Sequence, residues 1–214
     1  DYLKYEYRGC RPKQQEYMTN YWREMLGDKM ISDITTTDVI RGMEALPNRL
    51  SNATKNRYKA IISVIFSYAL RRYDLTHNPV QNIRSMRENN HRVRYLSNNE
   101  RKRLYEGCKA SNWTKLYLLI LMAITTGARK GELMNLKWSD IDLDRQTAYV
   151  ETTKNGLPKV MPLIDEVVVE LGRFIGQESE LIFNSKIKTN KPYEFYKLWK
   201  KALKFAEIED FRFH

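Results

Sequence analysis

The residues best suited to chemistry lie between positions 125 and 133, where a glycine is soon followed by an arginine and a glutamate. The apolar run before Gly127 indicates the end of a helix, which Gly127 can close in the left-handed conformation. Arg129 would then begin the next helix, with Glu132 one turn later. An arginine held beside a tight turn can present its planar, permanently charged guanidinium to two oxygens of one phosphate. The simpler alternative is a helix–turn–helix with a surface Arg129–Glu132 pair.

A second candidate is Lys154, which stands beside the dipeptide Asn155–Gly156. Asn-Gly is a strong signal for a hairpin turn, so the lysine is expected at a hairpin tip. An ammonium there could enter a site only when a polyanion is bound. A lysine in this position is otherwise an ordinary surface residue.

The arginine segment resembles the first arginine box of the tyrosine recombinases, the phage-integrase family. Members of this family break DNA by attack of a tyrosine oxygen on the scissile phosphate, without a metal or another cofactor. The resemblance implies that Arg129 neutralises charge on the phosphorane and that Glu132 is a partner that orients the arginine. It also implies that Lys154 protonates the departing 5′-oxygen and touches a base in the minor groove.

The last residue, His214, follows Phe211–Arg212–Phe213 and looks like the first histidine of the family's second box, His-x-x-Arg-x. A histidine there could exchange a proton or orient the phosphate. Arg212 lies two residues too early to be the second arginine, and none of the 14 tyrosines stands where the family places its nucleophile. We therefore expect a fragment of a longer integrase, with the nucleophile beyond residue 214 and the N-terminal arm-binding domain absent, that binds DNA and does not cleave it.

The composition favours a polyanionic partner. Lys and Arg total 37 against 26 Asp and Glu, a net charge of +11 that both halves of the chain share. Cys10 and Cys108 match no zinc or redox spacing, and the longest apolar run, residues 116–124, is too short to span a bilayer. With no signal peptide at the start, we expect a cytoplasmic protein of a bacterial host, associated with the nucleoid and without a membrane partner.

Residues 1–87 are predicted to form a small helical domain. The spacing of apolar residues predicts helices over 13–26, 39–46 and 52–73, the last capped by Ser51 or Asn52. The expected buried face of the third helix consists of Tyr58, Ile61, Ile62, Ile65, Phe66 and Ala69.

The same region is similar to the core-binding domain of the family. The similarity rests on short matches, none of which does chemistry: Asp33–Ile34–Thr35, Leu50–Ser51, Thr54, Asn56–Arg57, Phe66–Ser67–Tyr68–Ala69 and Asn78–Pro79–Val80. These matches lie upstream of the arginine box, where the family places this domain.

Residues 88–96 are predicted to link two domains. From residue 82 onward the helical spacing fades and arginines collect, at positions 84, 87, 92 and 94. In the family the equivalent strap runs beside DNA and lets the two domains clamp the duplex. The alternative is a solvated linker whose charges contact nothing.

Residues 97–214 are predicted to form part of a catalytic domain. Ser97 and Glu100 have the spacing of a capping box, and helices are expected over 98–109, 113–125, 129–136, 165–175 and 193–206. Three short strands are expected over 141–143, 147–153 and 159–163. The expected fold is therefore mainly α with a small antiparallel three-stranded sheet: a helical core-binding domain followed by a truncated α+β tyrosine-recombinase catalytic domain.

The expected partners are double-stranded DNA and, by resemblance, further recombinase protomers that form a tetramer on DNA. The exposed side of the helix after Ser51 carries three basic residues, and two more stand in the linker. We expect all five to face phosphates: Lys55, Arg57, Lys59, Arg92 and Arg94.

Site-specific recombination by a phage or prophage integrase is the function that these features favour. The alternative is a non-catalytic DNA-binding regulator that retains the recombinase clamp. A protein that binds RNA or single strands is disfavoured, because the long basic helix offers few exposed aromatic residues for base stacking.

Overall fold

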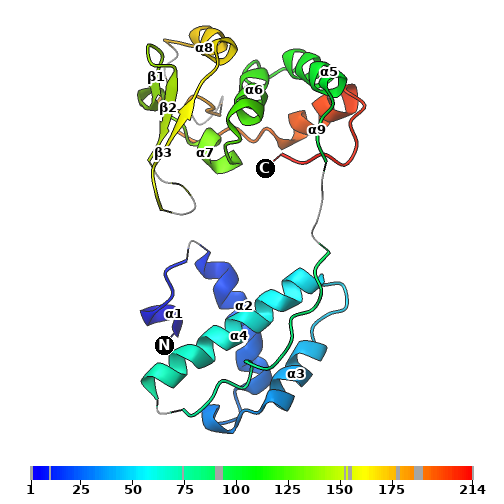
Figure 1. Ribbon diagram of the computed structural model, residues 1–214, viewed down its shortest axis with the longest axis vertical. Helices are drawn as coiled ribbons and strands as arrows, with labels where there is room; N and C mark the ends of the chain where they lie inside the picture. Colours follow the sequence, from blue (N-terminus) through cyan, green and yellow to red (C-terminus); the bar gives the residue numbers. More distant parts are fainter. Residues whose placement is uncertain are drawn as a thin grey trace. The chain divides into compact units, whose positions relative to one another are not determined.

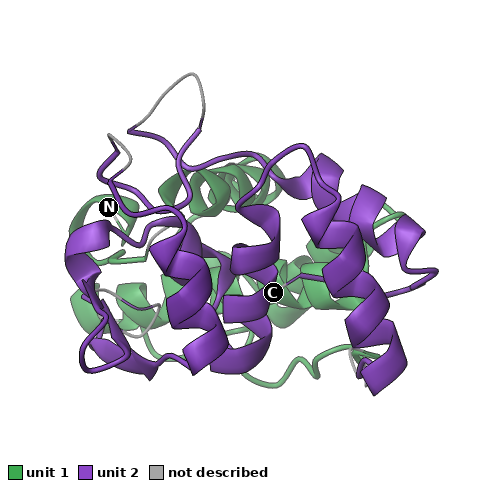
Figure 2. Cartoon of the chain, turned by 90° about the horizontal axis from the view of Figure 1, so that it is seen from above, with its two compact units in different colours: residues 1–91 green, residues 92–214 purple. Residues whose placement is uncertain are grey.

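The computed structural model describes residues 2–9, 11–73, 75–89, 94–151, 153, 156–176, 179–185 and 190–213. The chain divides into two compact units, unit 1 (residues 1–91) and unit 2 (residues 92–214), as Figure 2 shows. No helix within the described ranges is long and apolar enough to cross a membrane. Each unit folds around its own set of buried side chains.

Unit 1 is built from helices (Figure 1): α1 (Tyr2–Tyr5), α2 (Pro12–Leu26), the short 3₁₀ helix η1 (Ile31–Asp33), α3 (Thr36–Glu44) and α4 (Asn52–Arg72). The Ser51 hydroxyl accepts the Thr54 N–H and begins α4, as predicted. Helix α3 begins three residues before its predicted start, because Thr35 and Asp38 form a capping box there.

The core of unit 1 lies between α2, α3 and α4. The buried face predicted for α4 is confirmed at Tyr58, Ile61, Ile62, Phe66 and Ala69. Ile65 is only half-buried, and Tyr68, which the spacing does not predict, is buried. The Trp22 indole N–H of α2 donates to the Tyr58 carbonyl at 2.8 Å, so the tryptophan joins the two helices by a hydrogen bond as well as by packing.

The chain returns along α4 after that helix ends. The Asn78 amide nitrogen donates to the Ser63 carbonyl at 3.0 Å, and the Asn78 amide oxygen accepts the Val80 N–H at 3.0 Å. The matched segment Asn78–Pro79–Val80 therefore has a structural role, because it fastens the start of the return segment to α4.

Three side chains of α4 bind the rest of this return segment. They stand at positions 52, 56 and 59, one face of the helix, and each donates to a backbone carbonyl: Asn52 to Arg87 at 2.8 Å, Asn56 to Met86 at 2.9 Å and Lys59 to Ile83 at 2.7 Å. We call this row of contacts the α4 ladder. The basic run that begins at residue 82 is thus packed on α4 as far as residue 88, and only the chain beyond it can serve as a linker.

Unit 2 contains, within its described residues, the five helices and three strands that the sequence predicts. They are α5 (Asn98–Lys109), α6 (Leu116–Thr126), α7 (Lys130–Met134), β1 (Ile141–Asp142), β2 (Thr147–Val150), β3 (Lys159–Pro162), α8 (Asp165–Gly172) and α9 (Tyr196–Phe205), with the 3₁₀ helix η2 (Trp138–Asp140) before β1. The predicted capping box of Ser97 and Glu100 begins α5.

Several of these elements are shorter than predicted. Helix α6 begins at residue 116 instead of 113, and α9 begins at residue 196 instead of 193. The residues that precede the two helices pack on each other: the Trp113 and Tyr193 rings stack with centroids 4.3 Å apart. Their apolar spacing resembles that of a helix because both rings pack into the core, although neither residue is helical.

The sheet has the order β1–β2–β3 with antiparallel pairs. Ala148 pairs with Met161 and both side chains are fully buried, whereas the next pair, Tyr149 and Val160, is exposed. Helix α6 packs against α5 and α8 in the centre of the unit (Figure 1), and most of its side chains are buried. The architecture is mainly helical with one three-stranded antiparallel sheet, as predicted.

Candidate functional site

The turn before Arg129 is fixed by hydrogen bonds. Gly127 ends α6 in the left-handed conformation, with φ +61° and ψ 20°. The Thr126 hydroxyl donates to the Met122 carbonyl at 2.6 Å and accepts the Ala128 N–H at 3.2 Å. The residues that connect α6 to Arg129 are therefore bonded on both sides, and the arginine begins α7 at a defined place.

Glu132 holds Arg129 at two points. One carboxylate oxygen accepts the Arg129 backbone N–H at 3.1 Å, and the other accepts Nη1 of its guanidinium at 2.8 Å. Burial raises the pKa of Glu132, but the hydrogen bonds and charge of Arg129 outweigh it, so the net shift is downward and the carboxylate is ionised at neutral pH.

The exposure of the two side chains differs sharply. Only 5% of the Glu132 side chain is exposed, against 54% for Arg129. Among the described residues, the Arg129 guanidinium has no other hydrogen-bond partner. One edge of the guanidinium is thus held by a buried carboxylate while the rest is open. Because the side chain is already held in place, it loses little rotamer entropy when an oxyanion binds.

Lys159 is a charged neighbour of this pair that the sequence analysis did not single out. It lies at the start of β3, and its charge also lowers the pKa of Glu132. The strand therefore brings a second cation close to the Arg129–Glu132 pair. Lys159 pairs with Val150 of β2, and a strand register of this kind is not encoded locally, so the sequence alone carries little signal for Lys159.

Lys154 lies outside the described residues. The residues on either side of it do form a turn. Gly156 has φ +76°, its N–H donates to the Thr153 carbonyl at 2.9 Å, and the Thr153 hydroxyl donates to the Leu157 carbonyl at 2.8 Å. The role of Lys154 stays a prediction.

His214 also lies outside the described residues, but the segment that leads to it is anchored. The Phe213 ring lies 5.0 Å from Phe195 and 5.7 Å from Trp199, and Phe211 lies 6.1 Å from Trp199. This packing holds the segment against the start of α9.

An apolar cavity of about 160 Å³ lies between the arginine turn and the segment that precedes His214. Its lining includes Gly127 and Ala128 of the arginine turn together with Phe211 and Phe213 of the terminal segment. Residues that are far apart in the sequence thus border one space, and the residue next to His214 lies near the turn that positions Arg129.

The basic residues of α4 differ in their surroundings. Arg57 is exposed and Lys55 is half-buried. The Lys59 ammonium belongs to the α4 ladder and also donates to the Ser85 hydroxyl at 2.9 Å. Arg57 is therefore the most accessible of the three, and Lys59 already has partners within the chain.

The phosphate contacts predicted for the two linker arginines stay predictions. Arg92 lies outside the described residues. Arg94 forms an ion pair with Glu100, and the bond from Arg94, together with the Ser97 N–H, lowers the pKa of Glu100 to about 2. A phosphate would have to compete with that carboxylate for Arg94, so this contact stays a prediction.

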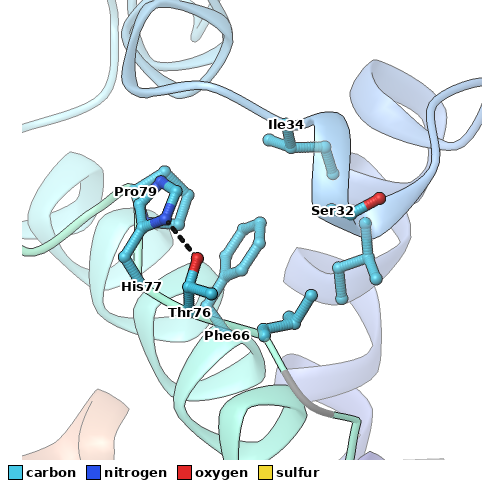
Figure 3. Close-up of a pocket in the computed structure, with 8 residues that line it drawn as sticks. Ser32, Ile34, Phe66, Thr76, His77 and Pro79 are labelled. Atoms are coloured by element: carbon cyan, nitrogen blue, oxygen red, sulfur yellow. Dashed lines mark hydrogen bonds between the residues drawn. The ribbon is translucent and has the colours of Figure 1, made fainter.

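Unit 1 contains a small pocket of about 140 Å³ between η1, α4 and the return segment (Figure 3). The Thr76 hydroxyl lies 3.2 Å from His77 Nδ1. The lining residues are Ile31, Ser32, Ile34, Phe66, Leu75, Thr76, His77 and Pro79. These described lining residues include no carboxylate, cysteine or second histidine, so among themselves they form no acid–base or metal-binding constellation.

Two sequence profiles match the chain. Residues 94–214 match the profile described as the phage integrase family, and residues 9–86 match the phage integrase central domain. The first match alone covers more than half of the chain. The chain belongs to the phage integrase family. The resemblance seen in the arginine box is thereby confirmed.

Individual relatives agree with this assignment. The chain is 25% identical to the integrase of Salmonella phage P22 over 91% of its own length, and 26% identical to the shufflon-specific DNA recombinase of Escherichia coli over 94%. It covers 59% and 54% of those proteins. The chain thus spans a little more than half the length of these two relatives.

The fold is similar to solved integrase structures. A lambda integrase (75–356) dimer bound to a COC′ core site has a TM-score of 0.74, with 21% identity and coverage of 99% of this chain and 75% of that one. The Tn1549 transposon integrase in complex with a circular intermediate DNA has a TM-score of 0.76, with 16% identity and coverage of 94% and 75%. At these identities the likeness shows the fold, which is the fold class predicted from the sequence.

Proposed function

We propose that this chain is the DNA-binding and phosphate-activating part of a site-specific tyrosine recombinase, the integrase of a phage or prophage. In the whole enzyme, a tyrosine oxygen attacks the scissile phosphate, leaves a 3′-phosphotyrosine and releases a 5′-hydroxyl that can reverse the step. The observation that supports the proposal most strongly is the Arg129–Glu132 pair, with a buried carboxylate on one edge of the guanidinium and the rest of the side chain open.

This geometry suits the charge that develops during phosphoryl transfer. Negative charge builds on the phosphate oxygens as the phosphorane forms, and the open part of the Arg129 guanidinium can donate to it. A preorganised donor of this kind contributes about 3–4 kcal/mol to transition-state stabilisation. Glu132 supplies no proton in the proposal, because its lowered pKa keeps it ionised and it serves to hold the guanidinium.

Two further residues complete the proposed site. Lys154 donates a proton to the departing 5′-oxygen, and His214 orients the phosphate or exchanges a proton with the nucleophile. The turn between Thr153 and Gly156 supports the first role. The cavity that the Phe211–Phe213 segment shares with the Arg129 turn supports the second.

The proposed partners are double-stranded DNA and further copies of the recombinase, four of them on DNA. The net charge of +11 favours the first. For the second, a similar solved structure is described as a lambda integrase tetramer bound to a Holliday junction. Since the relatives come from phages and bacteria, the proposal places the protein in the bacterial cytoplasm, at the nucleoid.

Residues 1–214 should bind duplex DNA and form no covalent adduct with it, because the proposed nucleophile is not one of their 14 tyrosines. Fluorescence anisotropy measures binding, and a nicked suicide substrate followed by denaturing electrophoresis detects an adduct. A phosphotyrosyl adduct would show that the nucleophile has been misassigned, and absence of binding would contradict the whole proposal. If the full-length protein binds its site but never forms the adduct, the non-catalytic regulator becomes the better description.

The basic face of α4 gives a second readout in the same assay. Lys55→Gln and Arg57→Gln should each reduce the slope of log affinity against log salt by about 0.9 for every phosphate that the variant no longer neutralises. Lys59 is less informative, because its replacement also breaks the α4 ladder. Unchanged slopes in both variants would remove α4 from the DNA interface while leaving the Arg129 site untouched.

A further inference from the structure

Helix α9 presents a strongly basic face in unit 2. Its ten residues include four lysines and no acidic residue. The four lysines lie outside the core, in which Trp199 and Ala202 of the same helix are buried: Lys197, Lys200, Lys201 and Lys204. The outer side of α9 therefore has a net positive charge that nothing within the helix balances.

Aromatic rings at the start of α9 connect this face to α7. Lys130 Nζ lies 5.4 Å from the centroid of the Phe195 ring and 5.8 Å from that of Tyr196. Lys200 Nζ lies 5.9 Å from the centroid of the same Tyr196 ring. The tyrosine ring is thus within cation–π distance of two ammonium groups that come from two helices.

Neither ammonium group is neutralised within the described part of the chain. No ion pair of Lys130 or Lys200 occurs there, whereas Lys137 of the same unit pairs with Glu180 at 2.6 Å. Both ammonium groups lie within 6 Å of one ring centroid, so at most about 12 Å separates them. Like charges at this distance repel each other through partly screened solvent, and an anion that approaches both would relieve the repulsion.

The position of Lys130 in the sequence indicates where such an anion would lie. Lys130 follows Arg129 directly, and Trp199 of α9 lines the same cavity as Gly127 and Ala128 of the arginine turn, so α9 packs near the turn that positions Arg129. Tyr196 is 43% exposed and Phe195 only 1%, so Phe195 supports Lys130 from the core side and Tyr196 is open to a ligand.

We propose that Lys130, Tyr196 and Lys200 form a second phosphate-binding surface, which contacts the DNA backbone beside the phosphate that Arg129 binds. This inference rests on the proposed function and deepens it. Duplex DNA fits the surface because it carries about one negative charge per 1.7 Å of its axis, so adjacent phosphates can approach both ammonium groups at once. A single carboxylate could pair closely with only one of them.

The test compares DNA binding by residues 1–214 and by Lys130→Gln, Lys200→Gln and the double variant. Each single variant should lower the salt slope by about 0.9, and the double variant by about twice that amount. A decrease of 0.9 in slope corresponds to about eightfold weaker binding at 0.1 M salt, relative to the extrapolated value at 1 M.

Lys109→Gln is the matched control. Lys109 also lies over a tyrosine ring, 4.3 Å from the centroid of Tyr117, but it ends α5 near the start of α6. Arg129 follows the opposite end of α6. The control removes a comparable cation–π pair and should keep the salt slope of the unaltered chain.

Tyr196 variants separate a binding role from a packing role. Tyr196→Phe keeps the ring face and should keep the slope, whereas Tyr196→Leu should lower it because the two lysines are no longer held in place. A purely structural role would lower the melting temperature in Tyr196→Leu and leave the slope unchanged.

The outcomes separate this inference from the proposed function. If the unaltered chain shows no salt-dependent binding to duplex DNA, the proposed function fails. If it binds and the lysine variants keep its slope, only the second surface is refuted. Variants that keep the slope but no longer self-associate in sedimentation would also refute it, because they would assign the two lysines to carboxylates of a second copy.

Discussion

The Arg129 guanidinium pairs with a carboxylate on one side and is open to a ligand on the other. Its inner edge pairs with the buried Glu132 carboxylate, and its outer part is open to a phosphate. A lysine could supply the charge but not the planar set of donors. Substitutions at this residue therefore affect both the stability of the turn and the proposed chemistry, and an experiment has to measure both.

In the proposed full-length recombinase, Arg129→Ala should keep site binding and reduce the rate of strand cleavage by about 100- to 1,000-fold, as for other preorganised donors. Arg129→Lys should also be poor, because a point charge cannot bind two oxygens in a plane. Anisotropy and single-turnover cleavage measure the two quantities separately.

Lys154→Ala is the comparison for these variants. If Lys154 protonates the 5′-oxygen, replacing that oxygen with sulfur, a better leaving group, should restore cleavage in Lys154→Ala and do much less for Arg129→Ala. Equal rescue of the two variants would show that the roles have been assigned wrongly.

At the scale of single elements, the features that the sequence predicts correctly are those that lie within one turn of chain. The capping box of Ser97 and Glu100, the Ser51 cap and the left-handed Gly127 each depend on residues at most four positions apart. The Arg129–Glu132 pair belongs to the same class, which is why a local motif reveals it. The physical cause is that the backbone geometry of a helix end fixes these distances without help from the rest of the fold.

The features that sequence reasoning misses depend on contacts between distant segments. The α4 ladder joins residues about thirty positions apart, and the Trp113–Tyr193 stack joins two segments that the apolar pattern assigns to helices. In the candidate site, the proximity of Lys159 depends on strand register, and the partners of Lys59 and Arg94 depend on side-chain choices that no spacing encodes.

Two glycines on either side of Arg129 allow a matched test of backbone strain. Gly127 has φ +61° with nothing within 4 Å of an added Cβ, so Gly127→Ala should cost about 1–2 kcal/mol purely through the left-handed conformation. Gly131 lies in α7 with the same open space but without a positive φ, so Gly131→Ala should stabilise the protein by about 0.4–1 kcal/mol. Chemical denaturation measures both, and a shift of the same sign in the two variants would contradict this account.

The start of α5 should respond to acid. The pKa of Glu100 is lowered to about 2 by Arg94 and the Ser97 N–H, so its contribution to stability is fully present above the pKa of an unfolded glutamate. That contribution should disappear as the pH falls from about 5 toward 2. Glu100→Gln should therefore lower the melting temperature at pH 7 and show a weaker decline between pH 5 and pH 2. Parallel pH profiles for the two proteins would argue against the ion pair.

At the scale of the whole molecule, the two units have separate cores with no buried residue in common. Phe66 belongs to the core of unit 1 and Leu119 to that of unit 2, and both are almost completely buried. Equilibrium unfolding should then show two transitions. Phe66→Ala should destabilise the first unit alone by about 3–5 kcal/mol and Leu119→Ala the second by about 2–5 kcal/mol. Calorimetry tests this prediction. A single transition whose midpoint temperature falls in both variants would mean that the units unfold together.

The α4 ladder also limits the tether between the two units. Glu88 is held on α4 by a 2.7 Å hydrogen bond from Asn56, and Arg94 is held in unit 2 by Glu100. The six peptide units between them reach at most about 22 Å, whereas a chain released from residue 82 to residue 96 would reach more than twice as far. If the first unit binds DNA as proposed, a short tether raises the effective concentration of the second unit at that DNA, and this concentration falls steeply as a tether lengthens. The hydrogen bonds of the α4 ladder thus limit the length of chain that is left to connect the two units.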